Sequence, residues 1–144
     1  MFQVKIFIET SITGPGRRKG EYAGLVEYIK RNGDPETREV IGQLDNTTFN
    51  QSTIVAAVES LKILNKNCDV TIITNCRYFN NVVERNFLKE WEENEWNRPN
   101  GKEVSNAQEW ESFLNLKHQH RIKVEYATKH EYKNYLKEKL DHKE

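Results

Sequence analysis

The stretch that most constrains the fold is the first one, residues 2–10, FQVKIFIET. Apolar residues fall at every second position from its start, while Gln3 and Lys5 take the other face, which is the pattern of a β-strand. Phe7 then makes the end of the stretch apolar on both faces, so we predict a central strand. The strand delivers a carboxylate, Glu9, to the rim of its sheet, and the turn-rich segment SITGPG follows at once. In an α/β sheet, that rim is where chemistry usually takes place.

Length and composition limit what can be built around this strand. A chain of 144 residues suits one domain, so we expect a single domain over residues 1–144. Lys plus Arg equals Asp plus Glu, 22 each, so a nucleic-acid site would have to be a local basic patch. There is no apolar run long enough for a membrane span and no signal-peptide pattern, so we expect a cytoplasmic protein without a membrane partner. Cys68 and Cys76 flank a predicted strand, too far apart for a disulfide.

The rest of the chain predicts an α/β order of elements. Two strands follow the first through connections too short for a crossover helix, so the three form an antiparallel meander. A later strand, DVTIIT, follows a helix and should lie parallel to the first strand, on the side opposite the second. Thr48, Asn50 or Ser52 could cap that helix. In chain order we predict strands at residues 22–31 and 38–44, a helix with apolar residues 54–64, a strand at 69–74, helical segments from 77 to 91 interrupted near 84–86, a helix from 106, a strand at 121–126 and a helix at 130–140.

Six motifs on this element order resemble type I ribonuclease H. IFIETSITGPG is similar to the family's first strand and Gly-Asn-Pro-Gly loop, and TFNQSTIVAAVESL is similar to the start of its first helix. TIITNCRYF, VSNAQEW and IKVEYATKH resemble three later motifs, and Trp91 and Trp96 keep the spacing of two tryptophans in the family's handle. The resemblance implies a ribonuclease H-like α/β fold: a five-stranded mixed sheet, with three antiparallel strands and then two parallel ones, flanked by helices.

The resemblance also implies a catalytic set. Family members hydrolyse the RNA strand of an RNA–DNA hybrid with two Mg²⁺ ions held by four carboxylates. Three of the four positions match Glu9, Thr53 and Asn75, and Glu131 or Glu138 could be proposed for the fourth, in the last helix. Of the four carboxylate positions, only the one that matches Glu9 is clearly occupied by an acid in this chain. Two divalent ions repel each other unless several carboxylates offset the repulsion. The set of carboxylates is therefore degenerate.

Further positions match the family's substrate contacts and its mobile histidine. His130 matches that histidine, which follows the fifth strand. The handle reads KEWEENEW here, and its acidic residues would oppose a polyanion. The candidate nucleic-acid contacts are Thr48 and Asn50, which match family positions, and the basic cluster of Arg17, Arg18 and Lys19 beside the TGPG turn.

These observations lead to one functional expectation and one alternative. We expect a ribonuclease H-like domain that has lost hybrid-cleaving activity, has no cofactor, and either binds an RNA–DNA hybrid or other nucleic acid weakly or interacts with a protein partner. The alternative is an active, metal-dependent ribonuclease H that cleaves the RNA of RNA–DNA hybrids with an altered carboxylate set. In that case Glu9 and an acid from the last helix would hold a single Mg²⁺ or Mn²⁺ ion.

Overall fold

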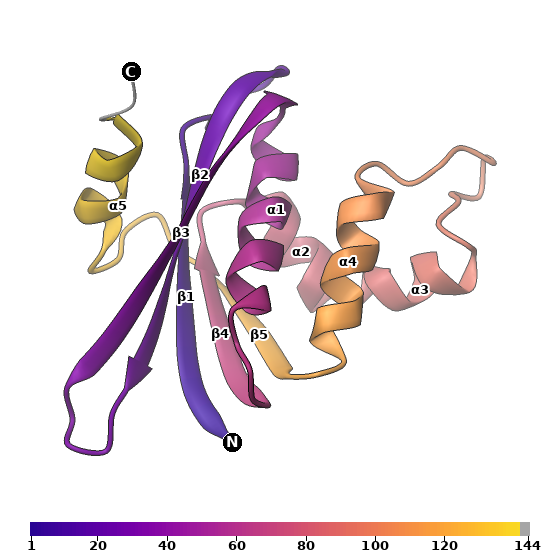
Figure 1. Ribbon diagram of the computed structural model, residues 1–144. Helices are drawn as coiled ribbons and strands as arrows, with labels where there is room; N and C mark the ends of the chain where they lie inside the picture. Colours follow the sequence, from indigo (N-terminus) through magenta and orange to yellow (C-terminus); the bar gives the residue numbers. More distant parts are fainter. Residues whose placement is uncertain (142–144) are drawn as a thin grey trace.

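A five-stranded mixed sheet forms the centre of the molecule in the computed structural model, which describes residues 1–141 (Figure 1). The strand order is β3-β2-β1-β4-β5, with β1 antiparallel to β2, β2 antiparallel to β3, and β4 parallel to both β1 and β5. Both the predicted sheet and the central place of the first strand are confirmed. The strands are β1 (Phe2–Thr10), β2 (Arg18–Ile29), β3 (Pro35–Thr47), β4 (Cys68–Thr74) and β5 (Arg121–Tyr126).

Helices cover both faces of this sheet, but unequally. Figure 1 shows α1, α2, α3 and α4 on one side of the sheet and α5 on the other. The helices are α1 (Phe49–Lys62), α2 (Arg77–Glu84), α3 (Phe87–Glu93), α4 (Ala107–Lys117) and α5 (Lys133–Asp141). Within residues 1–141, no helix has the length and apolar character needed to span a bilayer.

The side chains of β1 alternate between two cores. Ile6 and Ile8 are buried in the larger core, which also contains the apolar face of α1. Phe7 points the other way and packs with Leu136 and Leu140 of α5 in the smaller core. Successive side chains of a strand point to opposite faces, so Glu9 leaves the sheet on the same side as Phe7, toward α5.

Local capping residues explain where the helices begin and where one of them breaks. Thr48 caps α1, because its hydroxyl accepts the backbone N–H of Gln51 at 3.0 Å. The predicted interruption of the helix after residue 77 is confirmed: Asn86 has a left-handed backbone (φ 59°), which asparagine tolerates better than most residues. Asn106 has the same conformation and precedes α4, as predicted.

Two of the predicted boundaries that are wrong lie next to the candidate site. The loop expected over TGPGRRKG is shorter, because β2 already begins at Arg18 and pairs there with Thr47 of β3, next to an irregularity in the register. The last helix begins at Lys133 and not at His130, because His130 and Tyr132 bind other parts of the fold, as described below. Both differences concern residues of the candidate site.

An aromatic cluster holds α2, α3 and α4 together. Trp110 of α4 is fully buried, stacks on Phe79 of α2 and donates its indole N–H to the Tyr78 hydroxyl at 2.9 Å. Trp91 of α3 packs against it with ring centroids 6.5 Å apart, and Trp96 is half-buried against the same core. The two handle tryptophans therefore serve packing.

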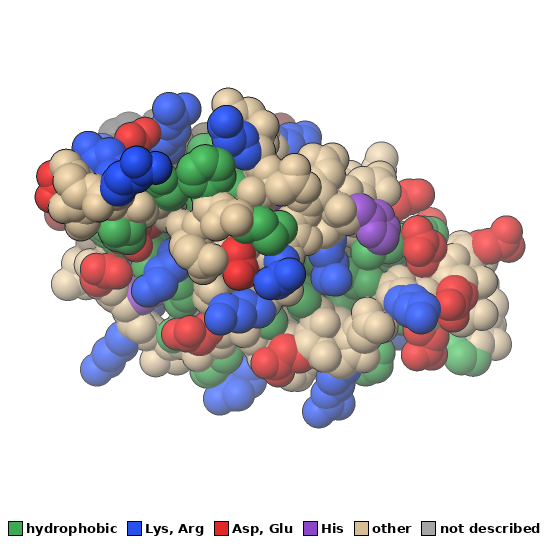
Figure 2. Space-filling model, turned by 90° about the horizontal axis from the view of Figure 1, so that it is seen from below, with side chains coloured by type: hydrophobic (Ala, Val, Ile, Leu, Met, Phe, Trp, Pro, Cys, Tyr) green, Lys and Arg blue, Asp and Glu red, His purple; other side chains and the backbone are tan. Residues whose placement is uncertain are grey.

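The outer surface of α3 is acidic. Figure 2, a view from below, shows acidic side chains gathered at the end of the molecule formed by α3 and the loop after it. The exposed acids of this segment are Glu90, Glu92, Glu93 and Glu95. This surface repels a polyanion, so nucleic acid would have to be bound elsewhere.

Candidate active site

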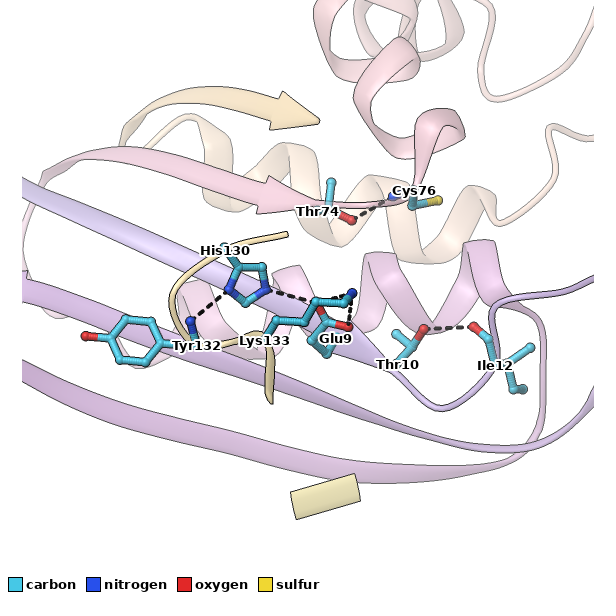
Figure 3. Close-up of polar contacts among 8 residues, drawn as sticks. All are labelled: Glu9, Thr10, Ile12, Thr74, Cys76, His130, Tyr132 and Lys133. Atoms are coloured by element: carbon cyan, nitrogen blue, oxygen red, sulfur yellow. Dashed lines mark hydrogen bonds and ion pairs between the residues drawn. The ribbon is translucent and has the colours of Figure 1, made fainter. Parts of the chain in front are cut away.

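The buried carboxylate of Glu9 is the centre of the candidate site. It ends β1 with only 3% of its side chain exposed, and two cationic or protonatable groups from the α5 end of the chain reach it (Figure 3). His130 Nε2 lies 2.9 Å from Glu9 Oε2, and Lys133 Nζ lies 3.5 Å from both carboxylate oxygens. A buried carboxylate needs such partners, because burial without them is costly.

The hydrogen bonds of His130 assign the proton on its ring. Nδ1 accepts the backbone N–H of Tyr132 at 3.2 Å, so this nitrogen carries a lone pair. The ring proton is therefore on Nε2, which donates to Glu9. The His130 ring also packs on Phe7, with centroids 5.0 Å apart, which keeps it in the plane needed for this bond.

Tyr132 fixes the same segment to β2. Its hydroxyl donates to the buried carboxylate of Glu27 at 2.5 Å. This hydrogen bond, together with burial of the ring and the charge of Glu27, raises the pKa of Tyr132 to about 12. The hydroxyl therefore stays protonated at neutral pH and holds the entry of α5 against the sheet.

Asn75 lies at the same rim of the sheet as Glu9. Phe7 of β1 pairs with Ile73 of β4, and Asn75 follows in the turn directly after β4 ends at Thr74. The Asn75 side chain is half-buried. Within residues 1–141, no hydrogen bond joins Glu9 to Asn75 or to Thr53.

Thr53 and Asn50 face the residue after Asn75. Thr53 is buried in α1 and donates its hydroxyl to the Phe49 carbonyl at 2.9 Å. Cys76 is fully buried beside them, and burial raises the pKa of its thiol, which donates to Asn50 Oδ1 at 3.3 Å. The thiol is thus a protonated donor that orients Asn50. Both cysteines, Cys68 and Cys76, are free, as predicted.

A polar groove of about 490 Å³ opens next to these residues, between the TGPG turn and the first turns of α1 and α4. Arg17 lines it and is held there, because Nη1 donates to the Asn46 carbonyl at 2.9 Å and to Gln51 Oε1 at 3.4 Å. The remaining lining residues are Thr13, Gly14, Pro15, Gly16, Thr48, Phe49, Asn50, Ser105 and Asn106.

Only one of the three residues in the predicted basic cluster lines the groove. Arg18 belongs to β2 and donates to the Pro15 carbonyl at 3.0 Å, and Lys19 is exposed on the same strand. Neither lines the groove, whereas Arg17, Thr48 and Asn50 do. Ser105 and Asn106, at the start of α4, join them in the groove although the sequence analysis did not select them.

The described residues contain no group of three or more His, Cys, Asp or Glu side chains that could hold a metal ion. Glu131 and Glu138, proposed for the last helix, are both exposed. Lys133 was missed as a site residue. No local signal in the sequence indicates it, because its partner Glu9 is 124 positions away in the chain.

Comparison with known proteins identifies the family. The model of the RNase H family matches residues 2–142. The chain belongs to the RNase H family. This RNase H chain is 32% identical to Ribonuclease H of Oleidesulfovibrio alaskensis over 131 residues, which cover 90% of this chain and 80% of the relative. It is 31% identical to Ribonuclease H of Acetivibrio thermocellus over 138 residues, which cover 93% and 89% of the two chains.

Solved structures of RNase H proteins share the fold. The crystal structure of LC9-RNase H1, a type 1 RNase H with the type 2 active-site motif, superposes with a TM-score of 0.80 at 21% identity. The match covers 97% of this chain and 71% of that one. The foamy viral protease–reverse transcriptase in complex with an RNA/DNA hybrid matches with a TM-score of 0.70 at 19% identity, over 96% of this chain and 19% of that one.

These relatives correct two predictions made from the sequence of this RNase H. The expectation that hybrid cleavage has been lost, in favour of weak nucleic-acid binding or protein interaction, is wrong, because relatives matched over nine-tenths of the chain are named Ribonuclease H. The expectation of no cofactor is corrected with it, since membership of this family implies Mg²⁺. A small number of acids does not exclude the ion, because Mg²⁺ can be bound by one or two carboxylates, with water and substrate phosphates as its other ligands.

Proposed function

We propose that this chain is a metal-dependent ribonuclease H that hydrolyses the RNA strand of RNA–DNA hybrids with an altered carboxylate set. The observation that carries the proposal is Glu9, a buried acid at the carboxyl end of the central strand of an RNase H fold. His130 and Asn75 complete the set from the neighbouring elements.

The donor set suits one Mg²⁺ or Mn²⁺ ion and does not suit two. Two divalent ions need several carboxylates between them, and residues 1–141 supply no such cluster. One ion needs only one or two carboxylates when water and substrate phosphates supply its remaining oxygen ligands. Glu9 would hold the ion, with the amide oxygen of Asn75 as a neutral ligand. A bound ion of this kind polarises the phosphate and lowers the pKa of an attacking water.

The hydrogen bonds of His130 orient Glu9. His130 donates from Nε2 to Glu9 Oε2 at 2.9 Å, while its Nδ1 accepts the backbone N–H of Tyr132 at 3.2 Å. These two contacts fix the position of the buried carboxylate that would hold the ion.

The polar groove provides a place for the hybrid backbone. Arg17 supplies its positive charge, Thr48 and Asn50 supply side-chain polar atoms, and the first turn of α1 supplies backbone N–H groups. Arg18 and Lys19 lie beside the groove and add to the local positive potential. No residue of α3 lines this groove.

A cleavage assay with matched substrates tests the proposal. The chain is incubated with an RNA–DNA hybrid, the RNA–RNA duplex and the DNA–DNA duplex of the same sequence, in Mg²⁺, in Mn²⁺ and in chelator. We expect cleavage of the RNA strand of the hybrid and of neither other duplex. This cleavage should occur in Mg²⁺ and in Mn²⁺ but not in chelator. Absence of cleavage with both metals would contradict the proposal.

A further inference from the structure

The sheet extends beyond the end of α1 and leaves a pocket at the opposite end of β1 from Glu9. Figure 1 shows the strands continuing past the last turn of α1, at the end of the molecule where the chain begins. The pocket there has a volume of about 240 Å³. Its apolar lining comes from alternate residues of β1 and β2 and from the segment after α1: Phe2, Val4, Val26, Tyr28, Ile63 and Leu64. Val4 precedes Glu9 by five positions on one strand, so the pocket lies about 16 Å from the candidate active site.

The pocket leaves apolar side chains exposed to water. Phe2 and Ile63 line it and are 41% and 37% exposed. Figure 2 views this end of the molecule and shows apolar side chains exposed between basic ones. Phe2 packs edge-on against Tyr28, with ring centroids 5.5 Å apart, so part of the wall is aromatic. A flat apolar group of a ligand would cover this surface.

The charges at the pocket favour a ligand with one negative charge. Arg38 and Lys66 supply two positive charges, and Glu36 supplies one negative charge at 3.8 Å from Arg38. Lys66 Nζ instead lies 5.8 Å from the centroid of the Phe2 ring, and Lys66 forms no ion pair within residues 1–141. The lining therefore carries a single net positive charge, and the cation without a carboxylate partner is next to the aromatic wall.

Contacts behind the pocket hold the segment that carries Lys66. The Cys68 thiol donates to the backbone carbonyl of Lys66 at 3.2 Å, and the Cys68 backbone N–H donates to His120 Nδ1 at 3.1 Å. The side-chain amide of Asn67 donates to the Gln119 carbonyl at 2.8 Å. These hydrogen bonds fix the connection between α1 and β4, so the pocket is formed before a ligand binds, as is usual for small-molecule sites.

We propose that this pocket binds a small aromatic carboxylate. The aromatic group lies against Phe2 and Tyr28, and the carboxylate pairs with Lys66 at the mouth. The pocket suits one ring with a short acid chain, because drug-sized ligands occupy cavities of about 300–1,000 Å³. This binding does not depend on the proposed function, since the pocket shares no lining residue with the polar groove or with the surroundings of Glu9.

An NMR titration of the whole chain tests the proposal without metal or hybrid, so the result is independent of hybrid cleavage. Hydrocinnamate is the probe, and its neutral amide, hydrocinnamide, is the matched control ligand. We expect hydrocinnamate to shift the backbone amide signals of Val4, Tyr28 and Cys68 with a dissociation constant of about 1 mM, as a ligand of this size can reach. Hydrocinnamide should bind roughly two- to fivefold more weakly, because it lacks the charge. Absence of saturable shifts at these residues would overturn the proposal.

Substitutions at exposed positions then test the charge and the aromatic wall separately. Lys66→Met should lower the affinity for hydrocinnamate to that for hydrocinnamide and leave the affinity for the amide unchanged. Phe2→Ala should weaken the binding of both ligands, because it removes part of the wall. Lys62→Met is the control, since Lys62 is an exposed lysine at the end of α1 that pairs with Glu59 and does not line the pocket. A preference for the carboxylate that persists in Lys66→Met, or that is lost equally in Lys62→Met, would contradict the assignment.

Discussion

His130 Nε2 donates to Glu9 Oε2 across 2.9 Å, and the two side chains are only 5% and 3% exposed. The residues are 121 positions apart in the chain, so this bond joins the segment before α5 to the end of the central strand. It also explains why α5 begins at Lys133, since His130 is held by the sheet and cannot join the helix.

Removal of the His130 ring tests this bond. His130→Ala leaves the Glu9 carboxylate buried without its closest partner, which should lower the free energy of unfolding by about 1–3 kcal/mol at neutral pH. Urea denaturation of the variant measures the loss, with His118→Ala as the control, because His118 is outside the site at the end of α4. Equal losses in the two variants would mean that the Glu9–His130 bond is not stabilising.

The hydrogen bond of Tyr132 predicts a fall of stability at high pH. The folded pKa, about 12, is above the ordinary value of 10.0, so the stabilisation is complete below pH 10 and is lost as pH rises from about 10 to 12. Tyr132→Phe should remove this pH dependence and cost about 1–3 kcal/mol at neutral pH, because the buried Glu27 loses its donor. Denaturation from pH 8 to 12 measures both effects.

Tyr135→Phe is the matched control for that experiment. The Tyr135 hydroxyl also donates to a glutamate, Glu39 of β3, but the Tyr135 side chain is exposed. Its removal should change stability at neutral pH very little. A loss as large as that of Tyr132→Phe would show that burial of the carboxylate is not the cause.

The groove predicts that the three residues of the basic cluster contribute unequally to the affinity for the hybrid. Arg17→Ala should weaken hybrid binding uniformly across sequences and lower the slope of log affinity against log salt by about one, as expected for one lost phosphate contact. Arg18→Ala and Lys19→Ala should have smaller effects, because their side chains lie outside the groove. Titrations at several salt concentrations measure this, with Arg31→Ala of the β2–β3 turn as the control.

The place of Asn75 at the rim predicts a gain of metal binding. Asn75→Asp puts a second carboxylate beside Glu9, so the variant should melt at a lower temperature than the parent in chelator. Millimolar Mg²⁺ should raise the melting temperature of the variant again, because a ligand stabilises the folded state that it binds. Asn81→Asp on the exposed side of α2 is the control. Lack of a Mg²⁺ response in Asn75→Asp beyond that of the control would mean that residue 75 does not face Glu9.

The sequence predicts most of this fold because the relevant signals are local. Alternation in residues 2–8 and the apolar Phe7 were enough to place β1 at the centre of the sheet. The cap at Thr48 and the interruption at Asn86 also depend on neighbours in the chain. The order of the elements followed from the same local patterns, and the resemblance to the family agreed with it.

The contacts of the site join residues that are far apart in the chain, so local sequence patterns could not predict them. Nothing near Lys133 or Glu27 in the chain indicates that each forms a pair across the fold, with Glu9 and Tyr132 respectively. Arg17 and Arg18 are adjacent in sequence but point to different surroundings, because β2 begins between them. The inferred loss of activity failed for another reason: it counted acids and left out the ligands that water and substrate supply.

The most direct test of the central claim is the single-turnover rate at which the parent and Glu9→Gln cleave the RNA strand of an RNA–DNA hybrid at saturating Mg²⁺. Glu9→Gln keeps the size of the side chain and removes the charge that would hold the ion. The account predicts metal-dependent cleavage by the parent and a rate at least roughly 10²-fold lower in Glu9→Gln. Equal rates in the two proteins, or no cleavage by the parent, would contradict it.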